Sequence, residues 1–174
     1  MKLYVARHGQ TSWNAQNKVC GVTDIGLNKK GIVQAEKLAD TVGNYNIDII
    51  LSSPLKRAVE TSKIIGRKNN IAIQIEDLLV EQNYGIYEGV DRNDPRFLNN
   101  KRDFAYRYPE GESMLQVAYR IYGVIDKIKE EQYGKNVLII SHGGVCRIIR
   151  TYFKDMTNDE FFNYRLENGT LEEF

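Results

Sequence analysis

The chain has 174 residues, enough for one domain that buries a sizeable core without disulfide bonds. Its 24 Lys and Arg residues nearly balance its 23 Asp and Glu residues, so the composition favours neither a nucleic-acid-binding surface nor an acidic tail. No apolar run reaches the roughly 18 residues of a membrane span, the N-terminus lacks a signal-peptide pattern, and Cys20 and Cys146 form no CxxC pair. We therefore expect a soluble, cytoplasmic, single domain over residues 1–174, with no nucleic acid or membrane partner.

Strand and helix patterns alternate along the first half of the chain. Residues 3–6 are an apolar run that predicts a buried strand, and the apolar spacing over 28–42 predicts an amphipathic helix. Residues 48–51 predict a second strand. The following Ser52-Ser53-Pro54 predicts a helix that begins there, with serine as N-cap and proline at the first helical position. Residues 71–75 predict a third strand.

The second half continues the alternation after one irregular segment. Residues 82–109 are polar and aromatic without a clean period, which is typical of a lid or a substrate-facing insertion. A long helix is predicted over 112–132, a buried strand over 137–141 and another helix over 145–153. Strands that alternate with helices predict an α/β fold, a three-layer α/β/α sandwich with a mainly parallel central sheet.

The two histidines of the chain occupy equivalent places in this pattern. His8 and His142 each come just after a predicted strand, and each is followed by glycine. Arg7 precedes the first histidine, and Arg57 falls in the first turn of the helix after the 48–51 strand. Because ligands of open α/β sheets bind beyond the carboxyl ends of the strands, these four side chains are expected to converge on one site.

Histidines also serve as metal ligands or as hydrogen-bonded structural residues. A third ligand at short spacing is missing and the neighbouring arginines would repel a cation, so we expect no metal and no other cofactor. Guanidinium groups grip phosphate oxygens in pairs, and a neutral imidazole can accept a phosphoryl group. Positive charge around the phosphate can then come from arginine rather than magnesium. The pattern favours a dianionic phosphate as the ligand.

Five segments, in order along nearly the whole chain, resemble the histidine phosphatase superfamily, the phosphoglycerate mutase-like proteins. Arg7-His8-Gly9-Gln10-Thr11 is similar to the RHGxT signature, and Asn14 matches the family's phosphate-binding asparagine. Residues 52–61 resemble the segment with the second arginine, Glu81 matches the acid, and Ser141-His142-Gly143-Gly144 matches the second histidine. The resemblance implies a phosphoglycerate mutase-like fold.

The resemblance also implies a division of roles. His8 would attack phosphorus and become phosphohistidine, and Glu81 would protonate the leaving oxygen and then activate water. Glu88 would be left to structural hydrogen bonds. The residues that would hold the transferring phosphoryl group, and that count as catalytic or phosphate-binding positions, are Arg7, Asn14, Arg57 and His142.

The sequence is compatible with more than one reaction at this site. Between Glu88-Gly89 and the Pro-x-Gly-Glu-Ser pattern at 109–113 the chain is shorter than in the mutases it resembles, and it ends soon after residue 170. A shorter cap should admit water, which favours a phosphomonoesterase acting on a small phosphorylated metabolite. A cofactor-dependent, mutase-type phosphotransferase remains the alternative. A catalytically silent phospho-ligand binder is less favoured, because it would be expected to have lost His8 or Glu81.

Tyrosines gather in and beside the irregular segment, where substrate specificity is expected to reside at residues 90–110. Their amphipathic rings suit either the core and surface or the wall of a substrate entrance. The sequence leaves both open for Tyr84, Tyr87, Tyr106 and Tyr108, and it leaves the oligomeric state open as well.

Overall fold

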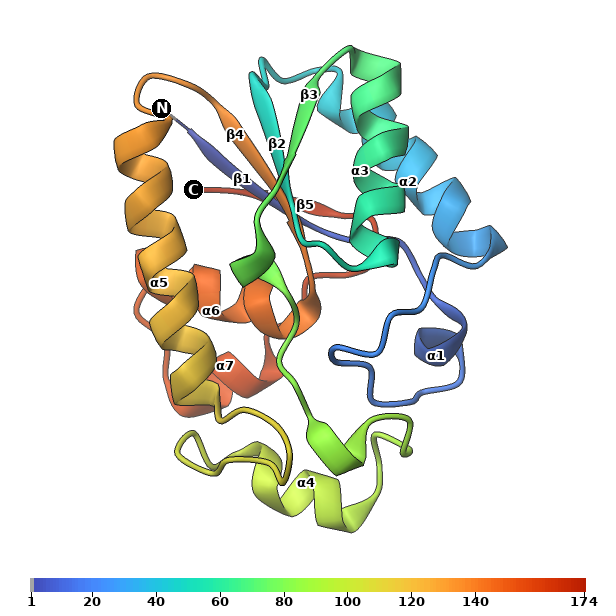
Figure 1. The fold of residues 1–174 in the computed structure, drawn as a ribbon, viewed down its shortest axis with the longest axis vertical. Helices are drawn as coiled ribbons and strands as arrows, with labels where there is room; N and C mark the ends of the chain where they lie inside the picture. The colour runs from blue at the N-terminus through green and yellow to red at the C-terminus, as the bar shows by residue number, and fades with distance from the viewer. Residues whose placement is uncertain (1) are drawn as a thin grey trace.

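The computed structural model describes residues 2–174 and confirms the predicted α/β class. Within that range, five strands form one sheet in the order β3-β2-β4-β1-β5 (Figure 1). The strands β1 to β4 run parallel, and β5 pairs antiparallel with β1. Their bounds are β1 Leu3–Arg7, β2 Ile49–Ser52, β3 Ala72–Ile75, β4 Val137–Ser141 and β5 Leu171–Glu173.

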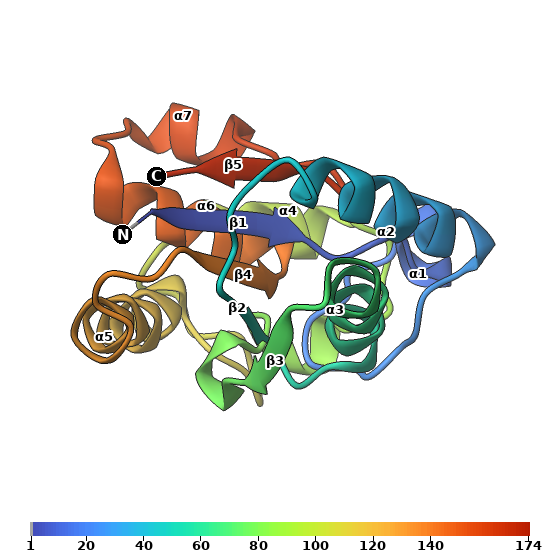
Figure 2. The same cartoon turned by 90° about the horizontal axis from the view of Figure 1, so that it is seen from above.

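Helices cover both faces of the sheet, as predicted. Figure 2 shows α2 and α3 on one side of the strands and α5 and α6 on the other. No helix within residues 2–174 combines the length and apolar character needed to cross a membrane. The helices are α1 Ser12–Ala15, α2 Lys29–Val42, α3 Lys56–Asn69, α4 Pro95–Lys101, α5 Met114–Glu131, α6 Gly143–Phe153 and α7 Asn158–Asn163, with 3-10 turns η1 Asp77–Leu79 and η2 Gly85–Tyr87.

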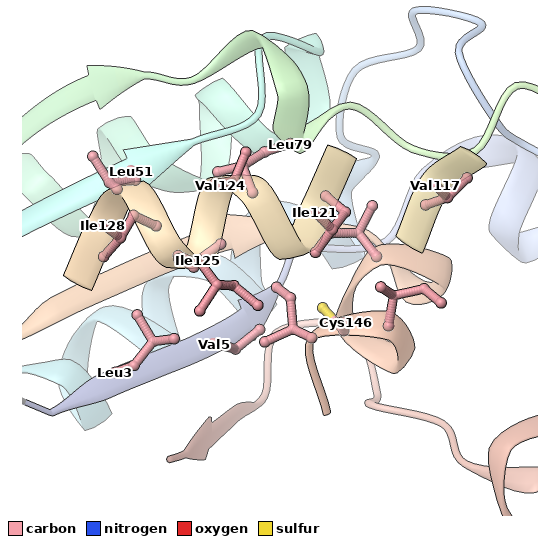
Figure 3. Packing of buried hydrophobic residues seen from close by; sticks show 14 of the residues in the cluster. Leu3, Val5, Leu51, Leu79, Val117, Ile121, Val124, Ile125, Ile128 and Cys146 are labelled. Atoms are coloured by element: carbon pink, nitrogen blue, oxygen red, sulfur yellow. The ribbon is translucent and has the colours of Figure 1, made fainter. Parts of the chain in front are cut away.

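Two cores arise because alternate side chains of a strand point to opposite faces. Along β1, Leu3 and Val5 pack into the core under α5 and α6, whereas Tyr4 and Ala6 pack under α2 and α3. Figure 3 shows the first core, where α5 turns residues such as Ile121 toward the strands. The central strands are therefore packed on both faces, and the side chains at their carboxyl ends adjoin this packed core.

Two predicted helix starts need correction, and both lie beside the histidines. The helix predicted to begin at Ser53-Pro54 begins at Lys56 instead, with Leu55 as an N-cap that makes no side-chain hydrogen bond. The Ser53 hydroxyl is used elsewhere, within 2.7 Å of His142. The helix predicted from residue 145 begins at Gly143, so the backbone amides after the histidine belong to its first turn.

The irregular segment 82–109 forms a small third cluster that includes α4 and lies beyond the carboxyl end of the sheet (Figure 1). Tyr84, Phe97 and Tyr108 are in ring contact, with centroids 5.4–5.8 Å apart. Tyr108 is buried, which confirms the core alternative for this residue, whereas Tyr84 both packs in the cluster and lines a pocket. The short elements α1, α4, α7 and β5 were not predicted.

Candidate active site

His8 is buried at the end of β1 in a defined tautomer. Its Nδ1 lies 2.6 Å from the carbonyl oxygen of Gly9, and a carbonyl can only accept a hydrogen bond. Nδ1 therefore carries the proton and Nε2 keeps its lone pair. The Nε–H of Arg57 points at this Nε2, at 3.2 Å. The imidazole is held as a neutral ring with its nucleophilic nitrogen facing a guanidinium.

Arg57 joins the two histidines from the first turn of α3. Its Nε also lies 3.1 Å from Nδ1 of His142, so one N–H is shared between the two rings. The opposite nitrogen of His142 is 2.7 Å from the Ser53 hydroxyl, and the two ring centroids are 5.0 Å apart. The prediction that three strand ends converge on these side chains agrees with this geometry.

Both imidazoles are kept uncharged by their surroundings. Burial, together with the charges of Arg57 and Arg7, holds the pKa of His8 well below its usual value. Burial, Arg57 and the neighbouring ring lower the pKa of His142 in the same direction. Since a protonated histidine has no free lone pair, this environment preserves a nucleophile at neutral pH.

The loop at residues 21–23 fixes the far side of Arg57. Its two terminal nitrogens donate to the carbonyl oxygens of Gly21, at 2.6 Å, and Thr23, at 3.0 Å. The carboxylate of Glu88 in turn accepts hydrogen bonds from the backbone amides of Val22 and Thr23, at 2.7 and 2.8 Å. The structural role predicted for Glu88 agrees with these contacts.

Glu81 is held by the amino end of α6. Its Oε2 accepts from the amide of Gly144 at 2.9 Å, and Oε1 accepts from Gln82 and Val145 at 2.9 and 3.3 Å. A carboxylate suits this place because the first amides of a helix have no partners inside the helix. Oε2 accepts only one of these bonds, so it has a second lone pair for a proton.

His8 and Glu81 line one pocket together with Arg7 and Asn14. Arg7 donates from Nη1 to the Leu166 carbonyl, while its buried Nε has no protein partner among the described residues. The Asn14 carbonyl accepts from the backbone of Thr11, which leaves its amide NH2 available to donate. The pocket thus combines a nucleophile, a carboxylate and free donors.

Four further cations line the same pocket and were not among the predicted site residues. They come from the segment after residue 90, the end of α4, the first half of α6 and the loop after α7. The sequence could have indicated one of them. Arg147 follows Gly143 by four residues, so a helix that begins at Gly143 places both residues on the face that lines the pocket. The four are Arg92, Lys101, Arg147 and Arg165.

The predicted residues fall into two adjoining groups. His8 belongs to both, because it contacts Arg57 and also lines the pocket with Glu81. Arg57 and His142 are buried behind it, 1% and 0% exposed. Within residues 2–174, no group of three or more His, Cys, Asp or Glu side chains is arranged to hold a metal ion.

The ends of a mainly parallel sheet hold a buried histidine pair that an arginine bridges, and one of the two histidines lines a basic pocket. This arrangement is typical of proteins that bind phosphate groups. Residues 3–174 match the family model of the histidine phosphatase superfamily (branch 1), and the chain belongs to this superfamily. The predicted resemblance is confirmed, together with the fold it implied.

Similar proteins include both phosphatases and mutases. The chain is 35% identical to the uncharacterized phosphatase PhoE of Bacillus subtilis over 96% of this chain and 84% of PhoE. It is 33% identical to the probable phosphoglycerate mutase GpmB of Yersinia pestis over 82% of this chain and 70% of GpmB. The solved alpha-ribazole phosphatase of Shigella flexneri superposes with a TM-score of 0.87 at 25% identity, over 99% of this chain and 89% of that one. These relatives support a phosphatase or mutase enzyme.

Proposed function

We propose that the protein is a phosphomonoesterase that hydrolyses a small phosphorylated metabolite through a phosphohistidine at His8. The observation that carries the proposal is the tautomer of this histidine. Its Nδ1–H is fixed on the Gly9 carbonyl, so Nε2 carries no proton, and its lone pair faces the Arg57 Nε–H that it shares with His142. A neutral nitrogen nucleophile next to a guanidinium suits the transfer of a phosphoryl group to histidine.

In the first step, Nε2 of His8 attacks phosphorus and the bond from phosphorus to the ester oxygen breaks. Arg7, Arg57 and the Asn14 amide stabilise the charge on the phosphoryl oxygens as it is redistributed. The electron pair of the broken bond stays on the leaving oxygen, which takes a proton from Oε2 of Glu81. The products of this step are an alcohol and the phosphoenzyme.

In the second step, water attacks the phosphohistidine and the nitrogen–phosphorus bond breaks. The Glu81 carboxylate, left ionised by the first step, takes a proton from that water. The electron pair returns to His8, inorganic phosphate leaves, and Glu81 is again protonated. His142 stays neutral throughout, because its Nδ1 accepts from Arg57 and its Nε2–H donates to Ser53.

Trapping the intermediate tests this proposal. Wild-type protein mixed with a 32P-labelled phosphomonoester and denatured in alkaline detergent should retain protein-bound label that acid removes and base does not. His8→Ala should lose the label and the turnover, whereas His142→Ala keeps the nucleophile and should still become labelled, more slowly. Near-normal turnover of His8→Ala, or label mapped to another residue, would refute the mechanism.

The similarity to the probable phosphoglycerate mutase GpmB favours one second candidate, a mutase-type phosphotransferase. The two reactions share the phosphoenzyme and differ in what consumes it. Labelled phosphoenzyme chased with 3-phosphoglycerate should release inorganic phosphate if the protein is a phosphatase. Transfer of most of the label to bisphosphoglycerate would establish the mutase instead.

A further inference from the structure

The segment that carries Glu81 has no regular structure of its own. Residues 80–84 lie between the 3-10 turns η1 and η2 and form neither helix nor strand. The amides of α6 hold the carboxylate of Glu81 at one end of the side chain. A proton-transfer group must lie within hydrogen-bond reach of the atom it serves, and a displacement of about 1 Å can be costly. The backbone of this residue therefore needs a second support.

Arg120, on α5, supplies contacts to this backbone. Its Nη2 donates to the carbonyl oxygen of Glu81 at 3.2 Å, and its Nη1 donates to the carbonyl oxygen of Leu78. The side chain of Arg120 is only 11% exposed. Hydrogen bonds from a charged donor are roughly twice as strong as neutral ones. One guanidinium thus holds the chain both at the end of η1 and at the acid itself.

Glu112 aligns this guanidinium and holds the other side of the acid. Its two carboxylate oxygens accept from Nε and Nη2 of Arg120 at 3.1 and 3.2 Å. The carboxylate also accepts from the amide of Asn83 at 3.0 Å, while the backbone amide of Glu112 donates to the Asn83 carbonyl at 2.8 Å. Glu112 is the glutamate of the Pro-x-Gly-Glu-Ser pattern at 109–113. The two side chains therefore hold the backbone before, at and after Glu81.

The geometry of this pair suits positioning better than stability. A partly buried ion pair often costs about as much free energy in desolvation as it returns. Lysine could also pair with Glu112, but a single ammonium cannot serve a carboxylate and two carbonyls in the fixed plane of a guanidinium. A second ion pair of α5, between Lys127 and Glu76 at 3.2 Å, reaches the chain five positions before Glu81. It provides a natural comparison, because it joins the same helix to the same part of the chain.

Building on the general-acid role proposed above for Glu81, we propose that Arg120, aligned by Glu112, is a positioning residue for the reaction. It fixes the backbone of Glu81 while α6 fixes the carboxylate, so that Oε2 stays where its proton can pass to the leaving oxygen as the ester bond breaks. Arg120 does not line the pocket, so it acts on the reaction through Glu81. Its loss should then matter in proportion to how much the leaving group needs a proton.

The substitution Arg120→Lys tests this with two leaving groups. The lysine keeps the positive charge, so the variant changes the geometry of the support. Burst rates are measured as phosphoenzyme formation from 32P-labelled glycerol 3-phosphate and as p-nitrophenolate release from p-nitrophenyl phosphate. We expect the burst with glycerol 3-phosphate to slow about tenfold or more, and the burst with p-nitrophenyl phosphate to slow less than about threefold.

A matched control and a double variant show whether the effect passes through Glu81. Lys127→Gln removes the comparison ion pair and should leave both burst rates within about twofold of the wild type. Arg120→Lys combined with Glu81→Gln should be no slower with glycerol 3-phosphate than Glu81→Gln alone, because no acid is left to position. A merely structural loss would instead multiply with the loss from Glu81→Gln.

A second variant covers the case in which Arg120→Lys does not fold. Glu112→Gln keeps the arginine but weakens its alignment, and it should show the same selectivity to a smaller extent. Thermal unfolding establishes which variants are folded at the assay temperature. Wild-type burst rates in the folded variants, equal slowing of both substrates, multiplied losses in the double variant, or the same selectivity in Lys127→Gln would each overturn the inference.

The proposed function and this inference fail in different measurements. If Glu81→Gln alone slows both substrates equally, the acid role of Glu81 fails. If Glu81→Gln is selective and Arg120→Lys is not, the proposed function stands and the positioning role of Arg120 is lost.

Discussion

Two glutamates seven positions apart illustrate how surroundings set the role of a carboxyl group. Glu81 is held at the amino end of α6 and lines the pocket. Glu88 instead accepts hydrogen bonds from the loop at Val22 and Thr23, whose neighbouring carbonyls hold Arg57. We therefore assign proton transfer to Glu81 and make Glu88 a positioning residue that acts through the arginine.

Substitution of each glutamate should separate these roles. An alkoxide leaves poorly without a proton, whereas p-nitrophenolate leaves well, so Glu81→Gln should slow an alkyl phosphate by about a hundredfold and p-nitrophenyl phosphate far less. Glu88→Gln places an amide NH2 against backbone N–H donors and displaces the loop that holds Arg57. Both substrates should then slow by similar factors. Burst-phase rates are the measurement, because a slow second step would hide the contrast.

A folding control is needed, because a misfolded variant would also lose activity. Circular dichroism and thermal unfolding should show both variants folded before the rates are compared. If Glu81→Gln slows the burst equally for both substrates, Glu81 is not the general acid. If Glu88→Gln slows the alkyl phosphate much more than p-nitrophenyl phosphate, Glu88 has that role.

At the scale of elements, the amino end of α6 contributes most to the site. The helix begins directly after His142, and the amide of its second residue, Gly144, holds Glu81. A Cβ at Gly144 would lie 2.6 Å from Oε1 of Glu81, closer than side chains tolerate. The missing side chain therefore makes room for the carboxylate.

Gly144→Ala should thus reproduce the effect of losing Glu81 without altering it. The added methyl group displaces the carboxylate, so hydrolysis of an alkyl phosphate should fall about tenfold or more while p-nitrophenyl phosphate is less affected. Gly123→Ala is the matched control, since a Cβ there meets nothing within 4 Å, and it should keep full activity with a slightly more stable helix. An unselective loss in Gly144→Ala would mean that the methyl group disturbs phosphate binding instead.

Elements with strong periodicity were predictable, and those set by tertiary contacts were not. The strand at 137–141 is apolar throughout, and the structure has β4 over the same residues. The start of α3 was misplaced because Ser53, a good N-cap by type, hydrogen-bonds to His142 instead. Strand β5 has three residues and exists through its pairing with β1, which no local pattern reveals.

The same distinction, between local pattern and tertiary contacts, separates the site residues that could be predicted from those that could not. His8 and His142 could be found because strands end at them, and Arg57 because it follows a strand within one helical turn. Arg92 and Lys101 lie in a segment without periodicity, where a cation usually indicates a solvated surface. Only the fold brings that segment over the carboxyl end of the sheet, so the sequence could not show that these two cations line the pocket.

Over the whole molecule the net charge is +1, but the charges are unevenly distributed, because among residues 2–174 five cations and only one carboxylate line the pocket. Cations concentrated at one pocket repel one another in the absence of an anion, which lowers the stability of the fold. Binding sites commonly retain such unfavourable arrangements because function requires them. In this chain the cost should be measurable at Lys101, whose charged form is disfavoured by burial and by four nearby arginines, Arg147, Arg92, Arg165 and, least of the four, Arg102.

We expect Lys101→Gln to unfold at a higher temperature than the wild type at pH 7. In a domain of this size about 1 kcal/mol corresponds to roughly 2–4 °C, and a rise on that scale or below it is anticipated for a partly exposed side chain. Inorganic phosphate should raise the Tm of the wild type, and raise that of Lys101→Gln by less. Arg102→Gln loses a surface ion pair with Asp159, and Arg102 contributes least of the four arginines to the lowered pKa of Lys101, so its rise should be smaller than that of Lys101→Gln.

The pH dependence of this difference gives the sharpest check. Because the folded state lowers the pKa of Lys101 from 10.5 to about 8, the charged lysine costs stability fully below pH 8, where both folded and unfolded chains are protonated. Between pH 8 and 10.5 the folded chain releases the proton and the cost fades. The Tm advantage of Lys101→Gln should therefore be greatest near pH 7 and shrink toward pH 10. An advantage that is absent at pH 7, or that grows with pH, would show that Lys101 is not repelled by the pocket arginines.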